Sequence, residues 1–210
     1  MTDPDGVPDF DAAFYHADAL VQTERREIPL ARPEVGKLTV VSGKIVACDG
    51  FIPSMDAFAK TVPPGDYPVI LSITDVGSGG LVAAALVQFS EERPLVWDMA
   101  NIAGRDASRK DLFRYGVDSG AGCFADLEAM QVLLHPWDAY DRYAEAARKQ
   151  VGNAWTYNSA NVPVGDNGLN IIAFSSGEGD GSYPSYFGYD RHGNIVCLAT
   201  DFGIISRLPR

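Results

Sequence analysis

The chain has 210 residues and a formal net charge of −11 at pH 7, with 46% hydrophobic and 21% charged residues. Ten Phe, nine Tyr and three Trp supply the large side chains of a filled core, which excludes a disordered or fibrous chain. The acidic balance excludes nucleic acid and an anionic membrane as expected partners, because both attract proteins through basic patches.

The length fits one domain, since single domains hold roughly 100 to 200 residues. We expect residues 1–36 to form an N-terminal helix with an extended arm, and residues 38–202 to form the core. No apolar run approaches the roughly 18 residues of a membrane span, and the first residues do not resemble a signal peptide. The sequence therefore predicts a cytoplasmic protein, in which Cys48, Cys123 and Cys197 are reduced thiols.

The N-terminal half predicts one helix followed by antiparallel strands. Apolar residues at helical spacing predict an amphipathic helix over residues 9–21. Strand-turn-strand patterns follow over residues 38–49 and 67–89, each with glycine in the turn. A further short strand is expected around Trp97.

The region between residues 115 and 150 predicts a pair of helices. Asp118 or Ser119 can cap a helix that begins near Gly122, and Asp138 can cap a second helix. Residues 153–167 are rich in turn formers and lack periodicity, so we expect a loop there.

The last forty residues predict a three-stranded antiparallel meander. Residues 170–174 form an apolar run typical of a buried strand, and residues 183–189 and 195–200 are separated by a turn at 190–194. A glycine-rich acidic loop, residues 175–182, joins the first two strands. The predicted fold class is α+β: mainly antiparallel β-sheet built from hairpins, with an N-terminal helix and a central helix pair.

Carboxylates beside glycines are the main candidates for chemistry. Carboxylates that converge from separate loops bind hard cations such as Mg²⁺, Mn²⁺ or Ca²⁺, or divide acid and base work, whereas isolated aspartates cap helices and close turns. We expect Asp180 to hold its own loop through an Asx-type turn. Asp126 and Asp180 are candidate catalytic carboxylates, and the candidate binding residues are Asp49, Asp118, Ser175, Glu178, Tyr183 and Asp201.

Cys123 is the candidate nucleophile of a thiol enzyme. It would lie in the first turn of the helix expected near Gly122, where free N–H groups and the helix dipole lower the pKa of a thiol. A base would have to come from His16, His135 or His192. The alternative interpretation is that Cys123 is a small core residue.

Three separated motifs, at residues 42–49, 117–126 and 176–183, are followed by a closing Asp-Phe pair. With these motifs the chain resembles a bacterial family of proteins of unknown function, the one numbered 4241, over about residues 38–202. The family name records no function, so the resemblance alone implies little about activity. Similar small acidic proteins accompany secreted bacterial toxins, and with the net charge of −11 and no recognised catalytic motif in the sequence this favours an immunity-type protein.

Three functions remain open on these observations, of which the third is a purely structural or ligand-sensing domain. The first is an acidic protein without catalysis that binds a basic protein partner, for which residues 1–20 and 165–183 offer acidic segments that would steer association. The second is a small enzyme: a metal-assisted hydrolase that uses Asp126, Asp180 and Asp201, or a thiol enzyme that uses Cys123. Convergence of the aspartates on one pocket would favour the enzyme.

Overall fold

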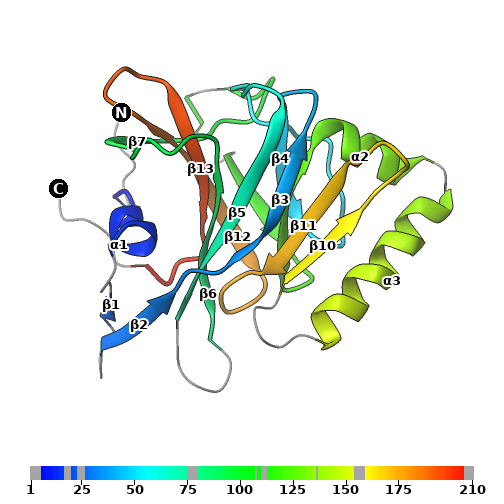
Figure 1. The fold of residues 1–210 in the computed structure, drawn as a ribbon, viewed down its shortest axis with the longest axis horizontal. Helices are drawn as coiled ribbons and strands as arrows, with labels where there is room; N and C mark the ends of the chain where they lie inside the picture. The colour runs from blue at the N-terminus through cyan, green and yellow to red at the C-terminus, as the bar shows by residue number, and fades with distance from the viewer. Residues whose placement is uncertain are drawn as a thin grey trace.

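The computed structural model describes residues 6–16, 20–22, 27–74, 80–106, 108–109, 113–135, 137–153 and 159–205. Two antiparallel sheets stack face to face, and helices cover both outer faces (Figure 1). Among the described residues no helix is long and apolar enough to cross a membrane. The predicted α+β fold class is confirmed.

The larger sheet contains nine strands within the described residues, in the order β1-β2-β5-β6-β13-β12-β7, with β3 paired to β5 and β8 paired to β12. These strands are β1 (Leu20–Gln22), β2 (Glu27–Ala31), β3 (Glu34–Val40), β5 (Gly65–Thr74), β6 (Val82–Gln88), β7 (Val96–Met99), β8 (Arg114–Val117), β12 (Gly181–Tyr189) and β13 (Ile195–Asp201). The smaller sheet has four strands in the order β10-β11-β9-β4, namely β10 (Ser159–Pro163), β11 (Asn170–Ser175), β9 (Ala121–Asp126) and β4 (Ile45–Asp49).

The main core lies between the sheets, because alternate residues of each strand point to opposite faces. On β9, Phe124 points into this core, whereas Cys123 and Ala125 point to the outer face of the smaller sheet. Helices α2 (Leu127–Leu134) and α3 (Trp137–Asn153) cover that outer face. The inward-facing side chains are apolar and buried; they include Leu38, Val40, Leu71, Val87, Phe174, Phe187 and Leu198.

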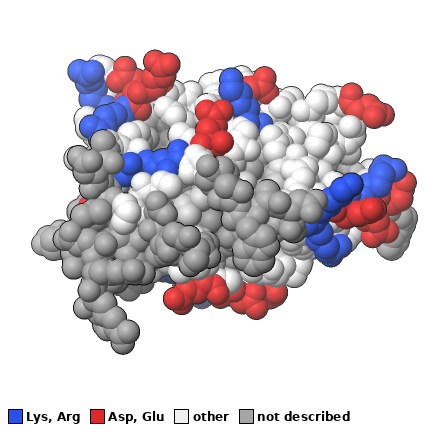
Figure 2. Space-filling view, turned by 60° about the horizontal axis from the view of Figure 1, so that its bottom comes forward, with Lys and Arg blue, Asp and Glu red and all other residues white. Residues whose placement is uncertain are grey.

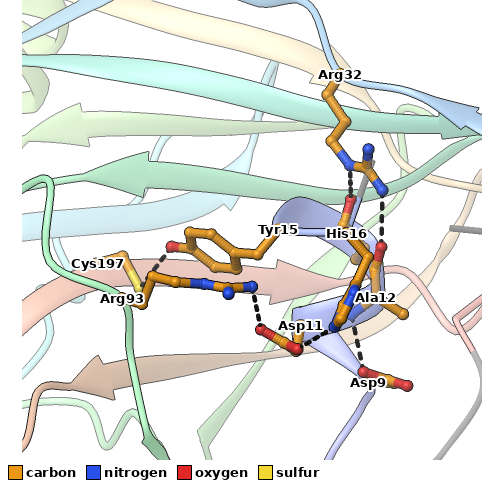
Figure 3. A network of polar contacts seen from close by, with 9 residues as sticks. Asp9, Asp11, Ala12, Tyr15, His16, Arg32, Arg93 and Cys197 are labelled. Atoms are coloured by element: carbon orange, nitrogen blue, oxygen red, sulfur yellow. Dashed lines mark hydrogen bonds and ion pairs between the residues drawn. The ribbon is translucent and has the colours of Figure 1, made fainter. Parts of the chain in front are cut away.

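Helix α1 (Phe10–Phe14) covers the outer face of the larger sheet (Figure 1). Asp9 caps its first turn by accepting a hydrogen bond from a backbone N–H, and Arg32 donates to two carbonyls of its last turn (Figure 3). Asp11 pairs with both Arg93 and His16. Charged side chains therefore fix a helix that is too short to be stable alone.

The N-terminal helix is shorter than the expected span of residues 9–21. It ends at Phe14, and residues 20–22 form β1, which pairs with β2; residues 17–19 lie outside the described part of the chain. Pairing with a neighbouring strand outweighs the weak helical preference of a short apolar pattern. The strand pair β5–β6 and the short β7 are confirmed.

The helix expected near Gly122 is wrong. Residues 121–126 form β9, the strand that pairs with both β4 and β11, and α2 begins only at Leu127 with Asp126 as its cap. Hydrogen bonding to two neighbouring strands outweighs the helical spacing of the apolar residues. The second expected helix is confirmed as α3, but it begins at Trp137, so Asp138 lies in its first turn and is not its cap as expected.

The three strands that were expected to form one meander do not all belong to the same sheet. The β12–β13 hairpin is present, and Gly193 takes the positive φ of 81° that its turn requires. However, β11 belongs to the smaller sheet, and so does β4, although β3 before it belongs to the larger sheet. The expected loop over residues 153–167 contains β10.

Asn170, the first residue of β11, links the smaller sheet to β3, an edge strand of the larger sheet. Its side-chain oxygen accepts a hydrogen bond from Thr39 N at 2.9 Å, and its amide nitrogen donates to Lys37 O at 2.8 Å and to Asn161 Oδ1 at 2.7 Å. The Asn170 side chain therefore binds two backbone groups of β3, Thr39 N and Lys37 O, that would otherwise need a neighbouring strand.

Asn170→Ala should lower the free energy of unfolding by about 2 kcal/mol, because it leaves part-buried backbone groups of β3 without their protein partner. Urea titration followed by circular dichroism would measure the loss. Gln131→Ala, which removes an amide from an exposed position of α2, is the control and should change stability by less than about 0.5 kcal/mol. Equal midpoints for the two variants would contradict this role of Asn170.

Candidate functional site

The predicted site residues gather mainly at one end of the sandwich, which we call the motif end: residues 49–52, 118–121 and 176–181. Antiparallel register pairs Asp49 with Gly122 and Ser175 with Ala121, so β4 and β11 finish where β9 begins. The end of the first sequence motif (42–49), the start of the second (117–126) and most of the third (176–183) therefore lie side by side.

Asp49 ties two of these loops together. Its side chain is 3% exposed. One carboxylate oxygen accepts hydrogen bonds from Phe51 N at 2.7 Å and Ile52 N at 3.0 Å; the other accepts from Asp118 N at 2.8 Å and Ser119 N at 2.9 Å. The Ser119 hydroxyl donates a further bond at 2.6 Å. Asp49 therefore supports the motif end from within.

Ser176 and Tyr183 hold the third loop. The Ser176 hydroxyl donates to Gly179 O at 2.8 Å, and the Tyr183 hydroxyl donates to the same oxygen at 2.7 Å. Ser176 N donates to Gly120 O at 3.1 Å, which joins this loop to the one held by Asp49. Asp180 is exposed and its carboxylate makes no hydrogen bond to any described residue, so the expected Asx-type turn is wrong.

A cavity of about 470 Å³ opens beside the motif end, between β4 and β8. Arg105 forms an ion pair with Asp56 inside it, and Arg114 donates to a backbone carbonyl of β12. Ile52 is 54% exposed at its margin. The ionisable or charged side chains of its lining belong to Cys48, Asp49, Asp56, Arg105, Arg114, Tyr115 and Asp118.

A sequence profile of a family described as protein of unknown function, DUF4241, matches residues 38–200. The chain belongs to the DUF4241 family. This confirms the resemblance seen in the motifs. Comparisons with curated proteins and with solved structures gave no match. The DUF4241 segment contains the motif end, the smaller sheet and helices α2 and α3, whereas α1, β1 and β2 precede it.

Asp126 lies at the opposite end of the smaller sheet from Asp49. It stands opposite Ile45, four residues from Asp49 along β4, a separation of roughly 13 Å. One of its oxygens accepts from Val41 N, Ser42 N and the Ser42 hydroxyl, and the other caps α2. Asp126 thus does not join Asp49 in a common site.

The remaining acidic candidates are spread along the motif end, opposite the end that holds Asp126. Asp201 is buried at the end of β13, where it accepts a hydrogen bond from Gly203 N. Asp118, Glu178 and Asp180 are exposed. Within the described part of the chain, no three His, Cys, Asp or Glu side chains lie close enough to hold a metal ion, so the cation hypothesis has no ligand set there.

Cys123 lies in a strand, and not in the first turn of a helix. It is 1% exposed, and its sulfur is 3.6 Å from that of Cys48. The hydrogen bond with Cys48, followed by burial, raises the pKa of Cys123 well above its ordinary value. None of the three histidines, all of which lie in the described chain, makes a hydrogen bond to it. This environment disfavours a thiolate.

Two tyrosines of α3 complete the support of the motif end and were not expected from the sequence. The Tyr143 hydroxyl donates to Gly50 O at 2.7 Å, and the Tyr140 hydroxyl donates to Phe51 O at 2.7 Å. Their spacing of three residues on an amphipathic helix was the available signal, but it equally fits plain packing. Arg105 and Arg114 were missed because nothing local distinguishes them from surface arginines.

Asp49→Asn should lower the free energy of unfolding by about 3 kcal/mol. The substitution removes the charge and turns an amide NH₂ toward backbone N–H groups, so that donors face donors. Asp180→Asn makes the same chemical change at an exposed position and should shift stability by less than about 0.5 kcal/mol. Guanidinium titration of both variants measures the difference, and similar losses in the two would refute the supporting role of Asp49.

Stability should decline above pH 10 partly through Tyr143. Burial raises the pKa of Tyr143 in the folded protein above its ordinary value of 10.0, so the unfolded chain loses this proton first. The stabilisation is therefore complete below pH 10 and falls as pH rises, by at most about 1.4 kcal/mol per pH unit. Tyr143→Phe should lose about 1 kcal/mol at pH 8 and show a shallower decline between about pH 10 and 11.5. Parallel stability curves for the two proteins would contradict the assignment.

Proposed function

We propose that this DUF4241 protein is a non-catalytic binding protein that recognises a basic partner protein through its acidic rim, the exposed side chains Asp118, Glu178 and Asp180. These side chains extend from two loops that are joined by the hydrogen bond between Ser176 N and Gly120 O. This joined pair of acidic loops is the observation that carries the proposal.

The buried and the exposed carboxylates have different partners, and this difference supports the proposed function. Asp49 and Asp126 use their oxygens to bind backbone N–H groups of the chain itself. The carboxylates of the acidic rim point to solvent and are available to an outside partner. Because Asp49, Ser176 and Tyr183 fix the loops, little conformational entropy is lost when a partner binds.

The acidic rim is narrower than the acidic surface expected from the sequence. Asp9 and Asp11 are engaged with α1 and its neighbours, and residues 1–5 and 17–19 lie outside the described chain. Asp166 lines a separate cavity beside α2 and α3, beyond the other end of β11. The face in Figure 2 carries small scattered groups of charged side chains, some mixed and some only acidic, so net charge alone does not mark a binding surface.

The net charge of −11 would still accelerate encounter with a basic partner. Attraction between opposite charges raises the association rate and falls off over roughly 10 Å at 0.1 M salt. The immunity-type interpretation of the family would make the partner a basic toxin, met in the cytoplasm. Both the class of partner and the compartment belong to the proposal.

The test uses two variants with the same change of charge. Glu178→Lys with Asp180→Lys reverses part of the acidic rim; Asp141→Lys with Glu145→Lys reverses two exposed acids on α3. A basic partner is captured from the native host at low salt and identified, and its binding rates to each protein are measured by surface plasmon resonance.

The rim variant should associate about tenfold more slowly at low salt, with a smaller difference at 0.5 M salt, while the α3 variant stays within about twofold of wild type. Melting temperatures verify that both variants are folded. Equal slowing in the two variants, or an association rate that ignores salt, would defeat the proposal.

A further inference from the structure

Two thiols face each other across the strand pair β4–β9. Cys48 and Cys123 occupy directly opposed positions, and their sulfurs are 3.6 Å apart. Cys48 is 4% exposed and Cys123 is 1% exposed. The proposed binding function uses neither thiol.

The backbone positions are suited to a covalent link. Gly50 N, two residues beyond Cys48, donates to Ala121 O, two residues before Cys123. Hydrogen-bonded pairs alternate along an antiparallel ladder, so the Cys48–Cys123 pair is also of the hydrogen-bonded kind, with Cα atoms about 5.5 Å apart. Disulfides span Cα separations of roughly 4.4–6.8 Å, so rotation of the side chains can bring the sulfurs to bonding distance.

We propose that Cys48 and Cys123 form a redox-active pair that closes to a cross-strand disulfide when the protein meets a peroxide. When the helix cover opens locally, water reaches the pair and removes the burial that disfavours the thiolate, so one cysteine loses its proton to water there. Its sulfur attacks a peroxide oxygen, the O–O bond breaks, hydroxide leaves and takes up that proton as water, and a sulfenic acid forms. The second sulfur attacks the sulfenic sulfur, the S–S bond forms, and water leaves. Two thiols and one hydrogen peroxide thus become one disulfide and two waters, with two electrons passing to the peroxide.

Helix α3 shields the thiols of Cys48 and Cys123 from solvent. Tyr143, Ala144 and Ala147 of α3 belong to the same buried cluster as both cysteines. Peroxide is small, and reaches the sulfurs when the helix cover opens locally. The same cover then shields the disulfide from bulky reductants.

Formation of the Cys48–Cys123 disulfide changes the backbone contacts next to the motif end. Both sulfurs lie near the backbone oxygen of Asp49, at 3.4 Å from Cys48 and 3.8 Å from Cys123. The disulfide has no S–H to donate to this oxygen, and it fixes β4 to β9 next to the residue that holds two loops. The oxidised protein should therefore be more stable and have a more rigid motif end.

The experiment treats intact wild-type protein with hydrogen peroxide, blocks remaining thiols with N-ethylmaleimide, and digests it with trypsin without reduction. The three cysteines fall in separate peptides, residues 45–60, 115–142 and 192–207. Mass spectrometry should find the first two joined with the loss of two hydrogens and the third unlinked. Dithiothreitol should reverse the link.

Oxidation should raise the melting temperature by up to about 10 °C, because the link joins residues 75 positions apart and restricts the unfolded chain. Cys197→Ala should keep the link and the shift, and Cys48→Ala should lose both. The wild-type peptide map stands even if Cys48→Ala fails to fold. Cysteines that stay reduced in the native protein, a link that needs prior unfolding, or a link through Cys197 would each overturn the proposal.

Discussion

The fold depends on buried carboxylates that bind the backbone where the chain passes from one sheet to the other. A crossing segment leaves the hydrogen-bond ladder of its sheet, so its N–H groups need other partners. Asp126 accepts from the crossing between β3 and β4, and Asp49 accepts from the crossing between β8 and β9. Each carboxylate comes from the opposite strand of the pair β4–β9, so this strand pair closes both crossings. Asp49 also accepts from Phe51 N and Ile52 N at the start of the crossing from β4 to β5.

The crossing from β11 to β12, in contrast, is held by hydroxyl groups. Ser176 and Tyr183 donate to carbonyl oxygens of the loop, and Gly177 takes a positive φ of 58° where a Cβ atom would approach Phe202 O. Neutral donors suffice because this loop turns its carbonyl groups inward. Its carboxylates, Glu178 and Asp180, are then not needed for folding and face solvent. The binding proposal rests on this difference between the crossings.

Local patterns predicted the elements more successfully than their partners. The hairpins β5–β6 and β12–β13 follow from apolar strands that flank a turn, and the second helix was expected in the right region, although Asp138 lies inside its first turn and is not its cap. Sheet membership did not follow, because the turn at Gly43 joins strands of different sheets while its sequence is also typical of a hairpin. β9 was missed for a related reason: its apolar spacing continues into α2, and the boundary at Asp126 becomes visible only once β4 and β11 flank it.

The same limit applies to the site. Asp49, Asp118 and Asp180 look alike in sequence, each next to or near glycine, yet one is a buried acceptor of backbone hydrogen bonds and two are exposed. What separates them is the direction of the side chain relative to a sheet that the local pattern does not specify. The sequence motifs of this chain are therefore mixed in structural role: Asp49 is buried and sets the positions of its loops, whereas Asp118 and Asp180 are exposed on loops of the motif end. Under the proposed binding function, a substitution at Asp49 would change binding indirectly, through misplaced loops, whereas one at Asp118 or Asp180 would act on the partner directly. Stability and binding measured on the same variant separate the two effects.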